Sequence, residues 1–183
     1  MILKRQILNQ KDIQITIERL CHKLIENHGD FKNTVIVGVQ PRGTLLSNRI
    51  IIKLKKILNT NIIESGSLDI SFYRDDLRRR KEPIVPEVMD MNVSLESKNI
   101  VLVDDVLFTG RSIRSAIDAL MSFGRPNSVE LLALIDRRFS REFPIQPDYV
   151  GRVVDSIDSE RVIVEWKEEN GKDRILMVKS DNE

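Results

Sequence analysis

The chain has 183 residues, of which 41% are hydrophobic and 31% charged, and its formal net charge is +1. This length and mixture predict one soluble domain over residues 1–183. The balanced charge excludes a general attraction to nucleic acid, so any RNA-binding face has to be local. The sequence has no signal peptide and no apolar run of about 18 residues, which predicts a cytoplasmic protein without membrane contact. Cys21 is the only cysteine and is expected in the core, so intramolecular disulfides and cysteine metal clusters are excluded.

The N-terminal part of the chain predicts a strand, a helix and a second strand. Residues 2–8 suit a short strand, and over residues 12–29 apolar side chains recur at the spacing of one helical face. His22 and His28 are expected at the surface of this helix. Residues 35–39, VIVGV, predict a strand buried on both faces.

A tight loop, Gln40-Pro41-Arg42-Gly43, follows that strand and leads into a helix that extends at least to Leu54. Gly43 permits close approach of another backbone, and Arg42 offers a planar cation to a pair of phosphate oxygens. Taken alone, Pro-Arg-Gly is a common turn and carries little information.

Residues 68–91 combine a strand pattern with a long charged segment. Apolar and polar residues alternate over 68–73, which predicts a strand. Residues 73–91 contain two prolines and no sustained period, so they predict either a lid over a polyanion or a solvated charge run. The cations at its start are Arg74, Arg78, Arg79, Arg80 and Lys81.

The most informative stretch is residues 100–112, IVLVDDVLFTGRS, which predicts a buried strand, a site and a helix start. The strand is expected to end at Asp104 and Asp105, whose carboxylates can accept hydrogen bonds from sugar hydroxyls or bind a hydrated magnesium ion. The turn at Thr109 opens a helix whose first N–H groups and dipole suit a phosphate. Together these features predict a ligand with both a phosphate and a ribose, although two aspartates can also simply end a strand.

The remaining chain predicts one more buried strand and a C-terminal hairpin. Residues 129–135 form an apolar run, and alternating strands and helices predict a mainly parallel sheet with helices on both faces and ligands at its carboxyl edge. Residues 113–121 predict a helix with one apolar face that includes Met121. Strands at 162–166 and 175–178 are expected to form a hairpin through Asn170-Gly171.

The stretch around Asp104 and Thr109 resembles the phosphoribosyl-diphosphate (PRPP) signature of type I phosphoribosyltransferases. A Walker lysine loop and a GxGxxG turn are both absent from the sequence. The resemblance implies the type I fold, an α/β fold with a flexible lid at about 73–91 and a small hood at about 144–178. It also implies a pyrophosphate loop at 40–43 with a strained or cis peptide, expected at Pro41-Arg42.

The resemblance assigns roles to individual residues. The catalytic residues would be Asp104, Asp105 and Arg42. The PRPP-binding segment would comprise Val106, Leu107, Phe108, Thr109, Gly110, Arg111 and Ser112. The lid cations would be Arg74, Arg78 and Arg79, and the base would meet Arg137 and the backbone of Val162 and Ile163. Magnesium would be the cofactor, held through substrate and water and bound directly by none of these side chains.

Three longer segments are similar to a bifunctional branch of this family, uracil phosphoribosyltransferases that also bind the leader mRNA of pyrimidine genes in response to UMP or UTP. These segments are residues 68–77, 99–126 and 144–151. The implied reaction is uracil + PRPP giving UMP + diphosphate, in a homodimer or larger oligomer. Where the purine-specific members carry an aspartate before Thr-Gly, this chain has Phe108, which favours uracil.

One departure from the branch keeps two alternatives open. The family sequence Asp-Arg-Gly-His-Arg is replaced at 136–141 by DRRFSR, so a catalytically weak, nucleotide-sensing RNA-binding regulator is one alternative. A phosphoribosyltransferase for another base is the second. Lys53, Lys55 and Lys56 are the candidate RNA-binding cluster, with a solvated helix face as the simpler interpretation.

Overall fold

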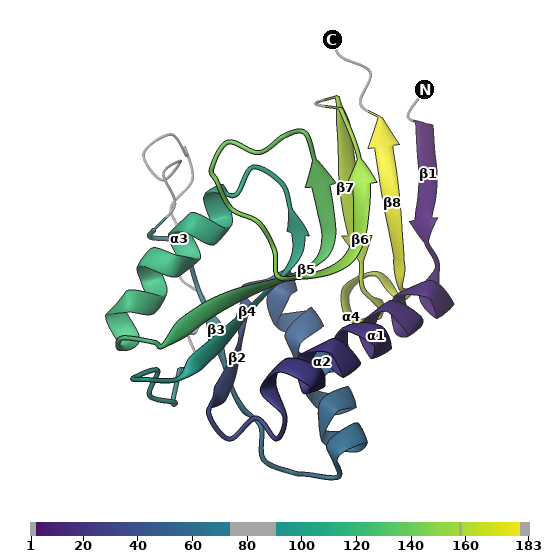
Figure 1. Cartoon of the computed structure of the whole chain (residues 1–183). Coiled ribbons are helices and arrows are strands. Elements are labelled where there is room, and N and C mark those ends of the chain that lie inside the picture. Colours follow the sequence, from purple (N-terminus) through teal and green to yellow (C-terminus); the bar gives the residue numbers. More distant parts are fainter. Residues whose placement is uncertain (1–2, 74–90, 158, 180–183) are drawn as a thin grey trace.

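The main structural unit is a five-stranded parallel sheet with the strand order β3-β2-β4-β5-β6 (Figure 1). The structure is a computed structural model that describes residues 3–73, 91–157 and 159–179. The strands of this sheet are β2 (Thr34–Val39), β3 (Glu64–Leu68), β4 (Asn99–Leu107), β5 (Ser128–Arg138) and β6 (Tyr149–Asp155). All four strand pairs are parallel, so the loops that leave their carboxyl ends gather at one edge.

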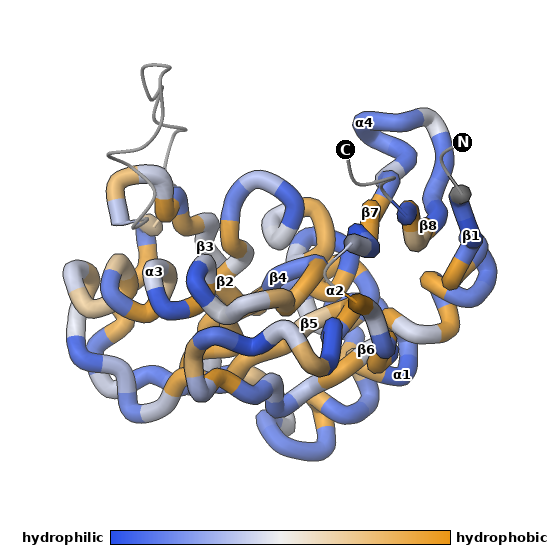
Figure 2. The backbone as a smooth tube through the Cα atoms, turned by 90° about the horizontal axis from the view of Figure 1, so that it is seen from above, coloured by the Kyte–Doolittle hydropathy of each residue, from blue (hydrophilic) through white to orange (hydrophobic). Residues whose placement is uncertain are grey.

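Helices cover both faces of this sheet, as the sequence predicted. On one face, α1 (Gln10–His28) and α2 (Arg42–Leu58) enclose one apolar cluster, and on the other α3 (Arg111–Leu120) encloses a second. Figure 2 shows the central strands mostly in the hydrophobic colour and the outer turns in the hydrophilic colour. Cys21 is fully buried, as expected, and burial raises the pKa of its thiol to about 12.

Two strands run further than the sequence predicted. β4 continues through both aspartates to Leu107, because its pairing with β5 extends to the register Leu107↔Asp136. β5 likewise continues to Arg138 because it pairs with β6 as far as Asp155. The acidic pair therefore lies within a strand, where the ladder of backbone hydrogen bonds fixes its position.

Three local expectations were wrong. The strand expected over 68–73 is absent, since β3 ends at Leu68, where the Asp69 side chain accepts a hydrogen bond from the Ser71 N–H and forms a turn. Met121 is 48% exposed, because the chain tightens into a 3₁₀ turn at that residue and leaves the apolar face. The His28 side chain is only 3% exposed and lies 3.2 Å from Glu130.

A second, three-stranded antiparallel sheet has the order β1-β8-β7. Its strands are β1 (Leu3–Leu8), β7 (Glu160–Glu165) and β8 (Arg174–Lys179), and the short helix α4 (Lys167–Asn170) joins β7 to β8. The hood was expected from residues 144–178 alone, but β6 joins the main sheet and the N-terminal strand joins the small one. Figure 1 shows this sheet beside the carboxyl half of β5 and β6.

The small sheet is fastened to α2 by one arginine. Arg49 donates to Asp173 at 2.7 and 2.9 Å and to Glu168 at 2.6 and 3.1 Å, and its guanidinium lies 4.5 Å from the ring of Trp166. Trp166 is fully buried, so apolar packing and an ion-pair network act at the same junction. Among the described residues, none of the helices has the length and apolar character that a bilayer span requires.

Candidate active site

The first turn of α2 lies against the backbone of β4. Gly43 is buried, and a Cβ atom at this position would collide with the carbonyl oxygen of Val103 and come within 3.2 Å of the Asp104 Cα. Only glycine permits this approach. The contact places Arg42 beside the acidic pair. The cis peptide bond found among the described residues joins Gln40 to Pro41, one bond before the expected Pro41-Arg42.

The two aspartates differ in their surroundings. Asp105 is 7% exposed, and its Oδ2 atom has no hydrogen-bond partner within the described part of the chain. Asp104 is more exposed, and its Oδ1 atom accepts the Asp105 N–H at 2.9 Å. Burial raises the pKa of both carboxyls; the Asp105 charge raises the pKa of Asp104 further, whereas Arg42 opposes the rise at Asp105.

These residues share a pocket of about 420 Å³ at the carboxyl edge of the sheet. It is lined by Val39, Gln40, Pro41, Arg42, Ile70, Ser71, Asp104, Asp105, Val106 and Ser112. The pocket thus brings together the predicted pyrophosphate loop and the predicted ribose-binding carboxylates. Ile70 and Ser71 were missed in the sequence, because they were assigned to a strand.

A second pocket of about 190 Å³ adjoins the first and is formed by residues 106–113 with Asp104. Gly110 has φ +89° and precedes α3, a backbone conformation that favours glycine. The first amides of α3 lack intrahelical acceptors, although the Thr109 hydroxyl accepts the Arg111 N–H at 3.3 Å. The Arg111 side chain donates to the Glu142 carboxylate at 2.6 Å.

Arg137, predicted to contact the base, is buried and connects two parts of the site. It is 4% exposed, and its guanidinium lies 3.8 Å from the Phe108 ring centroid. Its Nε donates to the Ser156 hydroxyl at 2.8 Å and its Nη2 to the Glu160 carbonyl at 2.7 Å. Glu160 begins β7, which carries the other predicted base-binding residues, Val162 and Ile163, both half-buried.

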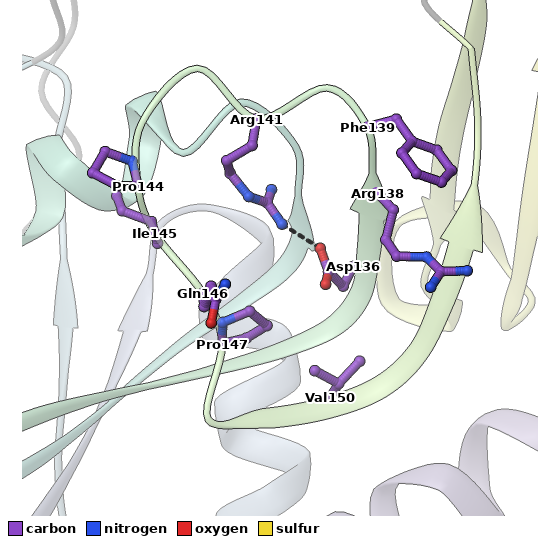
Figure 3. Close-up of a pocket in the computed structure, with 9 residues that line it drawn as sticks. All are labelled: Asp136, Arg138, Phe139, Arg141, Pro144, Ile145, Gln146, Pro147 and Val150. Atoms are coloured by element: carbon purple, nitrogen blue, oxygen red, sulfur yellow. Dashed lines mark hydrogen bonds and ion pairs between the residues drawn. The ribbon is translucent and has the colours of Figure 1, made fainter.

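The predicted lid cations, Arg74, Arg78 and Arg79, lie outside the described residues. A pocket of about 540 Å³ is lined by Asp136, Arg138 and Arg141 together with residues 144–147 (Figure 3). Arg141 and Ser156 contact predicted site residues. The sequence assigned no role to either, although Arg141 ends the segment 136–141 that departs from the family sequence.

Comparison with known proteins shows which family this chain belongs to. The phosphoribosyl transferase domain model matches residues 4–169. The bifunctional protein PyrR of Clostridioides difficile is 41% identical over 179 residues, which cover 97% of this chain and 99% of that protein. The Enterococcus faecalis (strain ATCC 47077 / OG1RF) PyrR is 38% identical over 178 residues, covering 97% and 98%. The chain belongs to the PyrR family.

Solved structures confirm that this chain has the type I phosphoribosyltransferase fold. A hypoxanthine phosphoribosyltransferase from Staphylococcus aureus superposes with a TM-score of 0.71 at 20% identity, over 97% of this chain and 93% of that one. The hypoxanthine phosphoribosyltransferase of Trypanosoma cruzi gives 0.71 at 16% identity, over 97% of each chain. At these identities the likeness concerns the fold alone.

The raised pKa values predict that the acidic pair destabilises the free protein. A carboxyl whose pKa is raised by folding lowers the free energy of unfolding at pH values above its folded pKa. This loss of stability disappears as the pH falls through that value and the carboxyl is protonated. We expect Asp104→Asn to increase the free energy of unfolding near pH 8 by about 1 kcal/mol or more, with the gain vanishing near pH 4.

Urea unfolding across that pH range measures this gain. Asp118→Asn is the matched control, because Asp118 forms an exposed i,i+4 pair with Arg114 at 2.8 Å and we expect it to bring no gain. A less stable Asp104→Asn protein near pH 8 would contradict the assignment of burial and repulsion as the cause.

Proposed function

We propose that this chain transfers the phosphoribosyl group of PRPP to uracil, giving UMP and diphosphate. The support is membership of the PyrR family together with the phosphoribosyl transferase domain. The observation that carries the proposal is the single pocket in which Arg42, Asp104 and Asp105 face one another beside the loop that opens α3. One anionic sugar with phosphates at both ends suits this arrangement of a cation, two carboxylates and a helix N-terminus.

The proposed chemistry is nucleophilic attack by a uracil nitrogen on the ribose carbon that bears the diphosphate. Departure of diphosphate leaves that carbon electron-poor, so positioning and charge stabilisation carry the catalysis. Asp104 and Asp105 hold the ribose hydroxyls, and Arg42 stabilises the departing negative charge. The amides of residues 107–112, with the Thr109 and Ser112 hydroxyls, hold the 5′-phosphate.

Magnesium is the proposed cofactor. The buried Oδ2 of Asp105 has no hydrogen-bond partner among the described residues, and carboxylate oxygens suit this hard cation. The described residues include no group of three or more histidine, cysteine or acidic side chains able to hold a metal. The ion would accordingly be held chiefly by substrate oxygens and water beside Asp104 and Asp105. When bound, it supplies positive charge to the diphosphate.

The base would lie between Arg137 and β7. Arg137 is the candidate for a uracil carbonyl, and the backbone of Val162 and Ile163 would read the pyrimidine edge. Phe108 replaces the carboxylate expected in purine-specific enzymes, and its ring is engaged by Arg137. A phosphoribosyltransferase for another base is the second candidate, and its only support here is a fold shared with hypoxanthine enzymes.

We also propose a regulatory, RNA-binding role, and this proposal rests on the PyrR relatives being bifunctional. Lys53 of the candidate cluster pairs with Glu18 at 3.0 Å, which weakens its claim to a phosphate. At 1.5 Å per residue it lies about 16 Å along α2 from Arg42, away from the catalytic pocket. A homodimer or larger oligomer stays a prediction.

The first prediction for the enzyme is that it forms UMP from uracil and PRPP only with magnesium. Asp105→Asn and Arg42→Ala each remove one group aimed at the ribose or diphosphate, and each is expected to lower kcat by about 10²–10³. Diphosphate release measures the rate. Asp118→Asn serves as the surface control, and an inactive wild-type protein would favour the catalytically weak sensor.

The second prediction concerns the choice of base. Without a carboxylate at position 108 there is no group to assist transfer to a purine, whereas the acidic N–H of uracil needs less help. We expect kcat/KM for uracil to exceed that for hypoxanthine and guanine by about 10²-fold or more, the size typical of one missing contact. Comparable values for either purine would make the second candidate function the better one.

The third prediction concerns RNA. In a gel-shift titration with the leader RNA of the organism's own pyrimidine genes, we expect specific binding that strengthens with UMP and weakens steeply with salt. An unrelated hairpin of equal length is the control. If both RNAs bind equally and UMP has no effect, the regulatory proposal fails while the enzymatic one stands.

A further inference from the structure

The connection between β5 and β6, residues 139–148, packs against the turn that opens α3. We call it the brace. The Arg141 guanidinium donates to the carbonyl oxygen of Phe108 and pairs with Asp136, and Figure 3 shows the two side chains facing each other. The backbone N–H groups of Glu142 and Phe143 both donate to the carbonyl oxygen of Thr109, at 2.9 and 3.1 Å.

These contacts fix two successive peptide planes. In a trans peptide the C=O of one residue and the N–H of the next lie in one plane and point in opposite directions. With the Phe108 and Thr109 carbonyls held toward the brace, the N–H groups of Thr109 and Gly110 point away from it. The pocket of about 190 Å³ lies on that other side, since its lining comprises Asp104 and residues 106–113 and no residue of the brace.

The brace is held firmly enough to act in this way. The Arg141 and Asp136 side chains are only 22% and 13% exposed, and a carbonyl that accepts from a guanidinium forms a stronger, charge-assisted bond. Glu142 adds an ion pair with Arg111. The Cβ of Phe143 lies 3.3 Å from where a Gly110 Cβ would stand, so the turn has little room to shift.

We propose that Arg141 is a positioning residue, which sets the amides of Thr109 and Gly110 toward the 5′-phosphate before substrate arrives. The inference rests on the proposed function. Donors fixed in advance cost no reorganisation when an anion binds, whereas a loose turn has to be ordered by the ligand. Loss of Arg141 therefore weakens the binding of every ligand that carries the 5′-phosphate. It leaves the binding of uracil unchanged, because uracil has no phosphate.

The test compares Arg141→Met, Arg141→Lys and Arg138→Met. Arg138 is the matched control, because it lies in the same pocket wall but pairs with Asp155 at 2.7 Å. Calorimetry gives the Kd of UMP, steady-state kinetics gives KM for PRPP and for uracil, and thermal unfolding shows that each variant is folded. Arg141→Lys keeps the charge but lacks the planar fork, so it reports on geometry even if the methionine variant fails to fold.

For Arg141→Met we expect the UMP Kd and the PRPP KM to rise roughly 10- to 100-fold, the cost of a small misplacement, with the uracil KM unchanged. Arg141→Lys should fall between this variant and the wild type. If the Arg141 variants lower Tm yet match Arg138→Met in Kd and KM, Arg141 is only structural and the inference is wrong. A wild-type protein that neither makes nor binds UMP would overturn the proposed function, and this inference with it.

Discussion

The contact between the first turn of α2 and the backbone of β4 sets the width of the whole site. Because Gly43 has no side chain, the carbonyl of Val103 and the first turn of α2, which carries Arg42, come together without an intervening layer. The parallel register of β2 and β4, with Gly38 opposite Val103, ends β2 one residue later, at Val39, beside the acidic pair of β4. A cation and two carboxylates therefore meet across one pocket, although more than 60 residues separate them in the sequence.

The position of the acidic pair lowers the stability of the fold. Two carboxyls with raised pKa values in adjacent positions of a strand oppose folding, and the surrounding apolar sheet compensates for them. Such a conflict between stability and local chemistry is typical of sites that await a ligand. The cations of the proposed substrate complex would relieve the same repulsion, so binding and stability are expected to rise together.

The sequence predicted the fold class correctly, because hydrophobic periodicity and turn chemistry are local signals. It placed the end of β4 at the two aspartates, before its actual end at Leu107, since carboxylates indicate a strand end and the pairing of Leu107 with Asp136 is not local. The contacts of Arg141 and Ser156 depend on loops that meet only in three dimensions. The predicted lid over 73–91 stays a prediction, because residues 74–90 lie outside the described ranges.

The pairing of β1 with β8 has a consequence for how the protein is made. Leu3 lies opposite Lys179, so the small sheet joins strands from opposite ends of the chain. During synthesis the five-stranded sheet has all of its strands by Asp155, whereas β1 waits for the last strand to leave the ribosome. Nascent chains that stall after β6 would thus contain the proposed phosphate-binding residues and Arg137, but would lack Val162 and Ile163 of β7.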